Sequence, residues 1–271
     1  MTPGGRRLSG EAGRRGRIAA LGVVGLVCTV GMVGMSDLGG SASVTKGGPA
    51  TRDEPAMTVG GASATTVPVL LVPGWFDSAR ELAALRIHLL GVGWPGSHVA
   101  AVDFREPTGS NRDHADELED AVEALLQSSG SSEIDIVAHS MGGLATRWYL
   151  LRQEGAPVRR VVFLASPHRG TLSAHLAWGG GREEMMPGSP FLDTLNTTAP
   201  TPPGVEAITV RTLIDTHIVP GESATLPDVP DYPLCCPTHS GLLRDPDVFE
   251  IVRSFLESGT VSRAPSSGVR P

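Results

Sequence analysis

From residue 67 onward, short apolar runs alternate with segments whose apolar residues recur at helical spacing, and this alternation constrains the fold most. The run at 67–72 contains no charged residue and ends at Pro73-Gly74, as expected for a strand buried on both faces of a parallel sheet. Five more strands are predicted by the runs at 99–104, 134–137, 161–164, 208–213 and 232–236. Strands that alternate with helices imply crossover connections. The sequence therefore predicts an α/β fold, a doubly wound and mostly parallel sheet of about six strands with helices on both faces.

Helices are predicted in the intervals between these strands. Ser78-x-x-Glu81 has the form of a capping box ahead of Leu82, Leu85 and Leu89. Two further helices are expected over 111–127 and 142–152. Before the last helix, Asp245 can cap the first turn and Pro246 suits the first helical position. Residues 172–205 break the alternation, and we expect them to form a short cap-like insertion in a catalytic domain that spans 67–258.

The first 66 residues do not follow this pattern. Five arginines within 6–17 precede an uncharged run at 18–35, and small residues follow it. This order is typical of an export signal, and the run also reaches the lower length limit of a membrane span. We expect residues 1–43 to be a signal peptide or an N-terminal membrane anchor, 44–66 a flexible linker rich in Gly, Ser and Thr, and 259–271 a disordered tail. The protein is then secreted and extracellular, or is tethered by residues 18–35 to the outer face of the cytoplasmic membrane.

Composition excludes several classes of protein. With 40% hydrophobic residues the chain can bury a core, which argues against wholesale disorder. A net charge of −7 argues against nucleic acid as a partner. The three cysteines are too few for a disulfide scaffold, and no Cys/His spacing indicates a zinc site, so neither metal nor cofactor is expected. The redox state of the adjacent Cys235 and Cys236 stays open, as does the oligomeric state.

Chemistry is indicated first at the end of the third predicted strand, where Ser140 stands in Ala138-His139-Ser140-Met141-Gly142-Gly143. A serine in a sharp strand-to-helix turn needs small neighbours, and Ala138 and Gly142 meet that need. The helix that follows directs its N-terminal amides toward the surroundings of the hydroxyl. The alternative is an ordinary strand–turn–helix with a capping serine.

A catalytic serine also needs a base, and the base needs a carboxylate that orients it. His239 lies in the loop before the last helix, where an imidazole can stand over the sheet, and Asp215 follows the fifth predicted strand. The order Ser140, Asp215, His239 matches the order of the triad in α/β-hydrolases. Glu222 is the alternative acid.

Four motifs together resemble the small secreted bacterial lipases of the α/β-hydrolase superfamily. They are Val72-Pro73-Gly74-Trp75, Ala138-His139-Ser140-Met141-Gly142-Gly143, Ala165-Ser166-Pro167-His168-Arg169-Gly170-Thr171 and His239-Ser240-Gly241-Leu242-Leu243. The resemblance covers about 67–258. It implies Ser140 as nucleophile, His239 as base and Asp215 as the third member, with an oxyanion hole from the backbone amides of Trp75 and Met141. The chain departs from the pattern at Pro73, where many members have His, and in one extra residue between Asp215 and Val219-Pro220.

The resemblance implies a serine carboxylic-ester hydrolase, a lipase or esterase that works through an acyl-enzyme intermediate on an ester or lipid substrate. Phe76, His168 and Leu242 are expected at the substrate site. Two alternatives stay open. A secreted acyltransferase would use the same triad, and a non-catalytic binding protein would use the same fold, because a fold alone does not imply a function. The acyl-chain length and the alcohol moiety also stay open.

Overall fold

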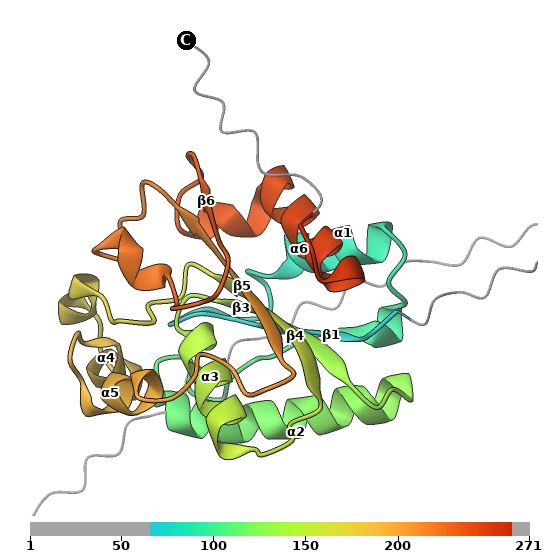
Figure 1. Cartoon of the computed structure of the whole chain (residues 1–271), viewed down its shortest axis with the longest axis horizontal. Helices are drawn as coiled ribbons and strands as arrows, with labels where there is room; N and C mark the ends of the chain where they lie inside the picture. The colour runs from blue at the N-terminus through green and yellow to red at the C-terminus, as the bar shows by residue number, and fades with distance from the viewer. Residues whose placement is uncertain (1–65, 262–271) are drawn as a thin grey trace, which may run out of the picture. The chain divides into compact units, whose positions relative to one another are not determined.

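One sheet of six parallel strands, in the order β2-β1-β3-β4-β5-β6, organises residues 66–261, which are the residues that the computed structural model describes (Figure 1). The strands are β1 (Val69–Val72), β2 (Val99–Ala101), β3 (Ile134–His139), β4 (Val158–Leu164), β5 (Glu206–Thr212) and β6 (Asp231–Leu234). Every neighbouring pair is parallel, so the carboxyl ends of the strands meet at one edge of the sheet. The predicted α/β-hydrolase architecture is confirmed.

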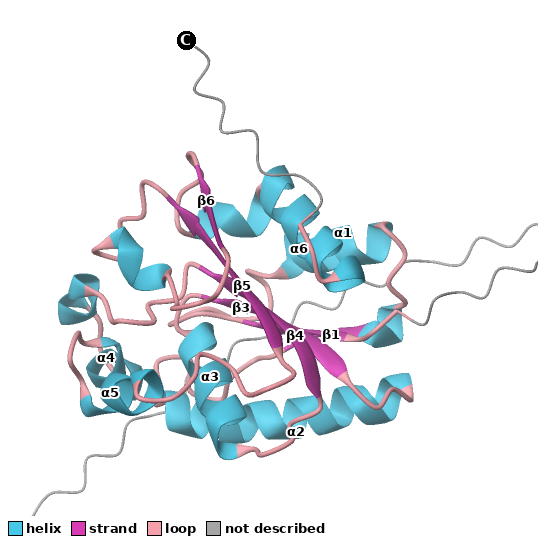
Figure 2. Cartoon of the chain, in the orientation of Figure 1, coloured by secondary structure: helices cyan, strands magenta, loops and turns pink. Residues whose placement is uncertain are grey.

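Helices cover both faces of the sheet (Figure 2). On one face lie α1 (Ala83–Gly91) and α6 (Pro246–Ser258), and on the other α2 (Asn111–Ser129) and α3 (Gly142–Arg152). Two shorter helices, α4 (Gly180–Met185) and α5 (Pro190–Asn196), belong to the segment that interrupts the alternation. Single-turn 3₁₀ helices complete the order: η1 (Gly96–His98), η2 (Leu172–Leu176), η3 (Gly221–Ala224) and η4 (Ser240–Arg244).

The strands bury both of their faces, which explains why they are continuous apolar runs in the sequence. Val69 and Leu71 of β1 pack with α1 and α6, whereas Leu70 and Val72 pack with α2 and α3. A third apolar cluster joins Met141 and Leu144, at the start of α3, to α4 and α5. Residues 172–205 are thereby seated beside the carboxyl edge of the sheet.

The two predicted helix starts have different outcomes. The side chain of Asp245 caps α6 by accepting from the amide of Asp247 at 2.9 Å, and Pro246 is the first helical residue, as expected. The capping box predicted at Ser78 is wrong, because residues 79–82 form turns and α1 begins only at Ala83, without a side-chain cap. The hydroxyl of Ser78 accepts from the amide of Arg80 instead.

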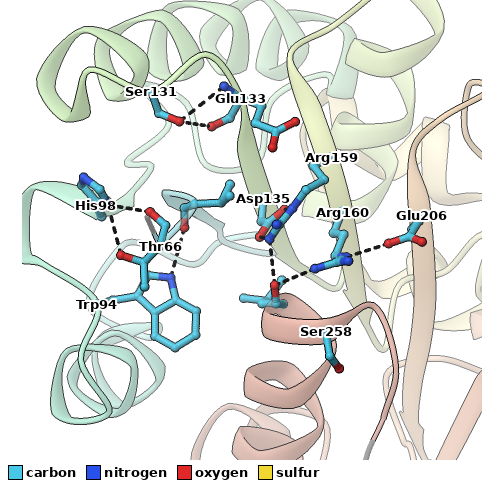
Figure 3. Close-up of polar contacts among 12 residues, drawn as sticks. Thr66, Trp94, His98, Ser131, Glu133, Asp135, Arg159, Arg160, Glu206 and Ser258 are labelled. Carbon is cyan, nitrogen blue, oxygen red and sulfur yellow. Dashed lines mark hydrogen bonds and ion pairs between the residues drawn. The ribbon is translucent and has the colours of Figure 1, made fainter. Parts of the chain in front are cut away.

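Two arginines at the amino end of β4 form ion pairs with carboxylates of the neighbouring strands and also donate to α6 (Figure 3). Arg159 donates to both carboxylate oxygens of Asp135, at 3.0 and 2.6 Å, and to the carbonyl of Leu256 at 2.7 Å. Arg160 contacts Glu206 at 2.6 Å and the same carbonyl at 2.8 Å. β4 begins at Val158, three residues before the apolar run that predicted it, because Val158 pairs with Ile134 of β3.

Both borders of the sheet are short strands. β2 has three residues and β6 has four, and Pro233 lies within β6. Directly after β6, Cys235 and Cys236 are joined by a disulfide.

Some expectations fall outside the described residues. The signal peptide or anchor at 1–43 lies outside, as do the linker at 44–66 apart from Thr66 and the tail at 259–271 beyond Val261. Within 66–261, no helix combines the length and the apolar character that crossing a membrane requires.

Candidate active site

Ser140 lies in the sharp turn between β3 and α3, where the backbone is strained. Its φ angle is +52°, in the left-handed region that residues with a side chain rarely adopt. The amide of Ser140 donates to the carbonyl of Leu164 at 2.8 Å and so fixes the turn to β4. Such outliers persist only where surrounding contacts hold them, and they cluster at functional sites. The turn places Ser140 at the carboxyl edge of the sheet, where α/β folds bind ligands.

Two glycines leave room for this turn, because a side chain on either would collide with a neighbour. A Cβ atom on Gly142 would lie 2.3 Å from the carbonyl oxygen of Pro73. A Cβ atom on Gly74 would lie 2.9 Å from Cβ of Ser140. The end of β1 therefore packs directly against the turn and the start of α3.

His239 and Asp215 are joined, although they come from loops that follow different strands. Nδ1 of His239 lies 2.8 Å from Oδ2 of Asp215, and their side chains are only 6% and 2% exposed. The other carboxylate oxygen, Oδ1, accepts from the backbone amides of His217 at 2.8 Å and Ile218 at 2.9 Å. Both oxygens of Asp215 are thus engaged, and the carboxylate holds one fixed orientation. Glu222, the alternative acid, is exposed in η3.

The environment sets the protonation of both residues. Burial alone would raise the pKa of Asp215, but hydrogen bonds from His239 and the two backbone amides outweigh burial, and the pKa is lowered. The pKa of His239 is lowered by burial first; the hydrogen bond to Asp215 opposes this change, and the rings of His139 and His217 add to it. At neutral pH the imidazole is therefore neutral and the carboxylate ionised, as a general base and its orienting partner require.

Two further imidazoles flank His239, and the sequence had not predicted a role for either. The ring centroids of His139 and His217 each lie 4.7 Å from that of His239. His139 is buried, and its Nδ1 lies 3.5 Å from Oδ2 of Asp77. The ligand atoms of Asp215, His217 and His239 lie within 4.8 Å of one another, the one such grouping in the described part of the chain that could hold a metal ion.

The two backbone amides predicted as an oxyanion hole belong to Trp75 and Met141. Trp75 follows Gly74 at the end of β1, and Met141 directly follows Ser140. Among the backbone hydrogen bonds of the turns and loops in residues 66–261, neither amide is a donor. The Met141 side chain is fully buried, and Nε1 of Trp75 donates to the carbonyl of Trp178 at 3.0 Å. Both backbone positions are therefore anchored by their side chains.

A cavity of about 420 Å³ opens beside these residues. Ser140 and His239 both line it, together with Trp75, Phe76 and His217. No hydrogen bond within the described residues joins Oγ of Ser140 to His239; such catalytic bonds often tighten only when substrate binds. Another cavity, of about 470 Å³, lies between α3 and residues 195–203 and contains none of the predicted site residues.

Phe76 and Leu176 line this cavity, and Trp178 packs beside them without lining it. Trp178 packs edge-on against Trp75 and Phe76, with ring centroids 4.5 and 5.4 Å apart. Phe76, Trp178 and Leu176 are nevertheless exposed, and Leu176 is 85% exposed. We call these three residues the apolar rim. An exposed apolar group of this kind at a cavity commonly marks a binding surface.

Two residues expected at the substrate site lie elsewhere. His168 is fully buried, stands edge-on to Phe163 and does not line the cavity. Burial, with the charges of Arg147 and Arg169, holds its pKa well below the usual range, so the ring is neutral. Leu242 is also fully buried, in the apolar core on the α1 and α6 side of the sheet. Sequence position near a strand end does not reveal which face of the loop a side chain occupies, and only Phe76 of the three reaches the cavity.

Comparisons with known proteins bear on the fold. A family model described as alpha/beta hydrolase fold matches residues 67–211. The crystal structure of Aspergillus fumigatus lipase B is similar with a TM-score of 0.63 and 19% identity, over 74% of this chain and 55% of that one. Bacillus licheniformis lipase BlEst2, in its mature form, has a TM-score of 0.60 and 15% identity, over 73% and 94% of the two chains. The product of the Listeria innocua gene lin2722 has a TM-score of 0.58 and 18% identity, over 73% and 97%.

The chain thus spans about half the length of the Aspergillus fumigatus lipase B that it matches. At these identities the structural similarities concern the fold alone. The family model covers more than half of the chain, and the six-stranded parallel sheet agrees with it. This chain belongs to the α/β-hydrolase family.

Proposed function

We propose that this protein is a serine carboxylic-ester hydrolase of the lipase or esterase type. The observation that carries the proposal is the arrangement of Ser140 and His239 on one cavity, with His239 held by Asp215 at 2.8 Å. A neutral imidazole and a strained serine that line the same cavity are the arrangement that nucleophilic catalysis uses.

In the proposed reaction, Oγ of Ser140 attacks the carbonyl carbon of an ester, and Nε2 of His239 takes the hydroxyl proton. Asp215 accepts the Nδ1 hydrogen bond and stabilises the imidazolium that forms. The alcohol leaves with the proton from His239. Water then attacks the acyl-enzyme, with His239 again as base, and the carboxylic acid is released.

The amides of Trp75 and Met141 are the proposed donors to the oxyanion. They flank the turn that carries Ser140 and have no backbone acceptor within the described turns and loops. Loss of a single oxyanion donor costs about 10²–10³ in rate in well-studied enzymes. Since both donors are backbone groups, side-chain substitution at either position tests packing and not donation.

The apolar rim supports an acyl chain as the group that the site accepts. Phe76 and Leu176 offer hydrophobic contact on the cavity wall, Trp178 packs against Phe76, and Ala174 and Met185 line the same cavity. Ligand sites that combine an apolar lining with a few polar groups favour substrates of the same character. The structural neighbours described as lipases agree with this choice.

Ser140→Ala tests the proposal, with the exposed Ser132→Ala as the matched control. Wild type and Ser132→Ala should hydrolyse p-nitrophenyl esters and react with a fluorophosphonate probe, which labels activated serines. Ser140→Ala should lose labelling and about 10⁴-fold or more of kcat while its thermal unfolding midpoint stays near that of wild type. Full hydrolysis by a folded Ser140→Ala variant would overturn the assignment. An unlabelled wild-type protein would favour a binding function.

A further inference from the structure

We propose that Asp215, His217 and His239 form a binding site for a divalent first-row transition cation such as Zn²⁺, and that its occupation reversibly inhibits hydrolysis. The inhibition rests on the proposed function, whereas the binding does not. Two imidazoles and one carboxylate are a ligand set that zinc accepts, with a fourth position left for water. Their ligand atoms already lie within 4.8 Å of one another.

His217 supplies the third ligand of this site. Asp215 and His239 are already joined by a hydrogen bond and would provide only two ligands. His217 occupies the segment where the chain has one residue more than the lipase pattern between Asp215 and Val219-Pro220. Its ring stacks on that of His239 with an interplanar angle of 22° and a centroid distance of 4.7 Å.

The backbone of His217 is fixed, but its side chain has room to move. Its amide donates to Oδ1 of Asp215, and its carbonyl accepts from the hydroxyls of Thr171 and Ser173. Its ring is exposed and lines the cavity, with a 3.4 Å contact to the hydroxyl of Thr216 as its side-chain hydrogen bond. The imidazole can thus rotate toward a cation without disturbing the loop that carries it.

The distances fit a small tetrahedral ion after modest adjustment. Zinc bonds to nitrogen and carboxylate oxygen at about 2.0–2.2 Å, so two of its ligand atoms lie about 3.4 Å apart. Nδ1 of His239 and Oδ2 of Asp215 are 2.8 Å apart and must separate slightly. The ligand atom of His217 lies at most 4.8 Å from the other two and must approach by no more than about 1.4 Å. Oδ1 of Asp215 keeps its two backbone hydrogen bonds in this arrangement.

Inhibition follows from the single proton of the neutral imidazole. In the free protein this proton sits on Nδ1 and faces Asp215, which leaves Nε2 able to accept the proton of Ser140. When a cation binds Nδ1, the ring proton is carried on Nε2 instead. Nε2 then cannot accept a proton, and Asp215 no longer stabilises an imidazolium, so the serine loses its base.

The test uses the full-length chain without a histidine tag. Zinc binding is measured by isothermal titration calorimetry on Ser140→Ala, alone and combined with His217→Asn or with His175→Asn. His175 is exposed nearby but does not line the cavity, so it is the matched control. We expect one zinc per chain, at least about tenfold weaker binding with His217→Asn, and no change with His175→Asn.

Inhibition is measured separately in proteins that retain Ser140. Zinc should inhibit ester hydrolysis by wild type and His175→Asn, and a chelator should restore it. The half-inhibitory zinc concentration of His217→Asn, relative to its own uninhibited rate, should rise by about tenfold or more. Equal zinc binding with and without His217 would overturn the site, and bound zinc that leaves hydrolysis intact would overturn its effect. If wild type hydrolyses no ester, the proposed function fails, yet calorimetry still decides whether the cation binds.

Discussion

Nδ1 of His239 and Oδ2 of Asp215 lie 2.8 Å apart across the loops that follow β6 and β5. Because Asp215 is an acceptor, the Nδ1 nitrogen carries the proton and Nε2 faces the cavity as a base. Asp215→Asn would place a donor opposite Nδ1 and favour the wrong tautomer. We expect kcat for ester hydrolysis to fall about 10⁴-fold with little change in stability. Glu222→Gln, at the exposed alternative acid, should retain wild-type kcat; the reverse pattern would assign the acid to Glu222.

The acid limb of the pH profile should report the lowered pKa of His239. Burial, with His139 and His217, lowers this pKa from its ordinary value of 6.5, against the raising effect of Asp215. Since the neutral ring is the base, kcat/KM should rise with pH to a plateau, with a midpoint below 6.5. His217→Asn removes an imidazole whose electrostatic interaction lowers the pKa of His239, so the midpoint should move upward. A wild-type midpoint above 6.5 would contradict this account.

Gly142→Ala should damage the turn that holds Ser140. The new Cβ would lie 2.3 Å from the carbonyl oxygen of Pro73, and backbone cannot yield as a flexible side chain can. Overpacking of this kind costs about 1–3 kcal/mol, and the end of β1 would shift with the Trp75 amide. Denaturant unfolding should show the loss of stability, and esterase assays a loss of kcat. Gly91→Ala is the control, since its Cβ would meet nothing within 4 Å; equal effects of the two changes would contradict the packing argument.

Asp135→Ala should strongly destabilise the fold, because it leaves the guanidinium of Arg159 without its carboxylate. The side chain of Asp135 is 1% exposed, and removal of one partner from a buried pair costs about 3–5 kcal/mol. Asp116→Ala breaks the exposed pair with Arg152 and should cost less than about 1 kcal/mol. Urea unfolding monitored by circular dichroism compares the two variants. A similar cost for both would show that burial of the Asp135 pair does not decide its importance.

The apolar rim should set the preference for acyl-chain length. Phe76→Ser and Trp178→Ser remove contacts that only a long chain reaches, so kcat/KM for long-chain p-nitrophenyl esters should fall about tenfold, with acetate little affected. That change corresponds to about 1.4 kcal/mol, close to the low end of the roughly 1.5–3 kcal/mol gained on fully burying one such side chain. Ile87→Ser, at an exposed position on α1, is the control. Uniform loss across all chain lengths would point to a structural effect instead.

Local patterns predicted the sheet and its helices well where burial and capping act together. The continuous apolar runs matched strands buried on both faces, and Asp245-Pro246 marked the start of α6. Patterns failed where contacts distant in sequence decide the structure. Arg159 and Arg160 lie within β4, where they form ion pairs with Asp135 and Glu206 of the neighbouring strands. A pattern of neighbouring residues in the sequence cannot predict these pairs.

The candidate site was predictable in its order but not in its surroundings. The order of the motifs along the chain selected Ser140, Asp215 and His239. In the structure Asp215 is hydrogen-bonded to His239, and Ser140 and His239 line one cavity. Which side chain points inward depends on loop conformation, and this explains the placement of His168 and Leu242 in the core. The rings of His139 and His217 flank His239 because the end of β3 and two separate loops converge, and the spacing of these histidines along the chain does not reveal this contact.

The short borders of the sheet bear on how the protein behaves in concentrated solution. Exposed strand edges are templates for pairing between molecules, and long flat edges promote aggregation. β2 offers three residues and β6 four, one of which is Pro233 with no amide hydrogen to donate. A neighbouring molecule would gain few hydrogen bonds at either border, so the folded sheet is a poor seed for fibrils.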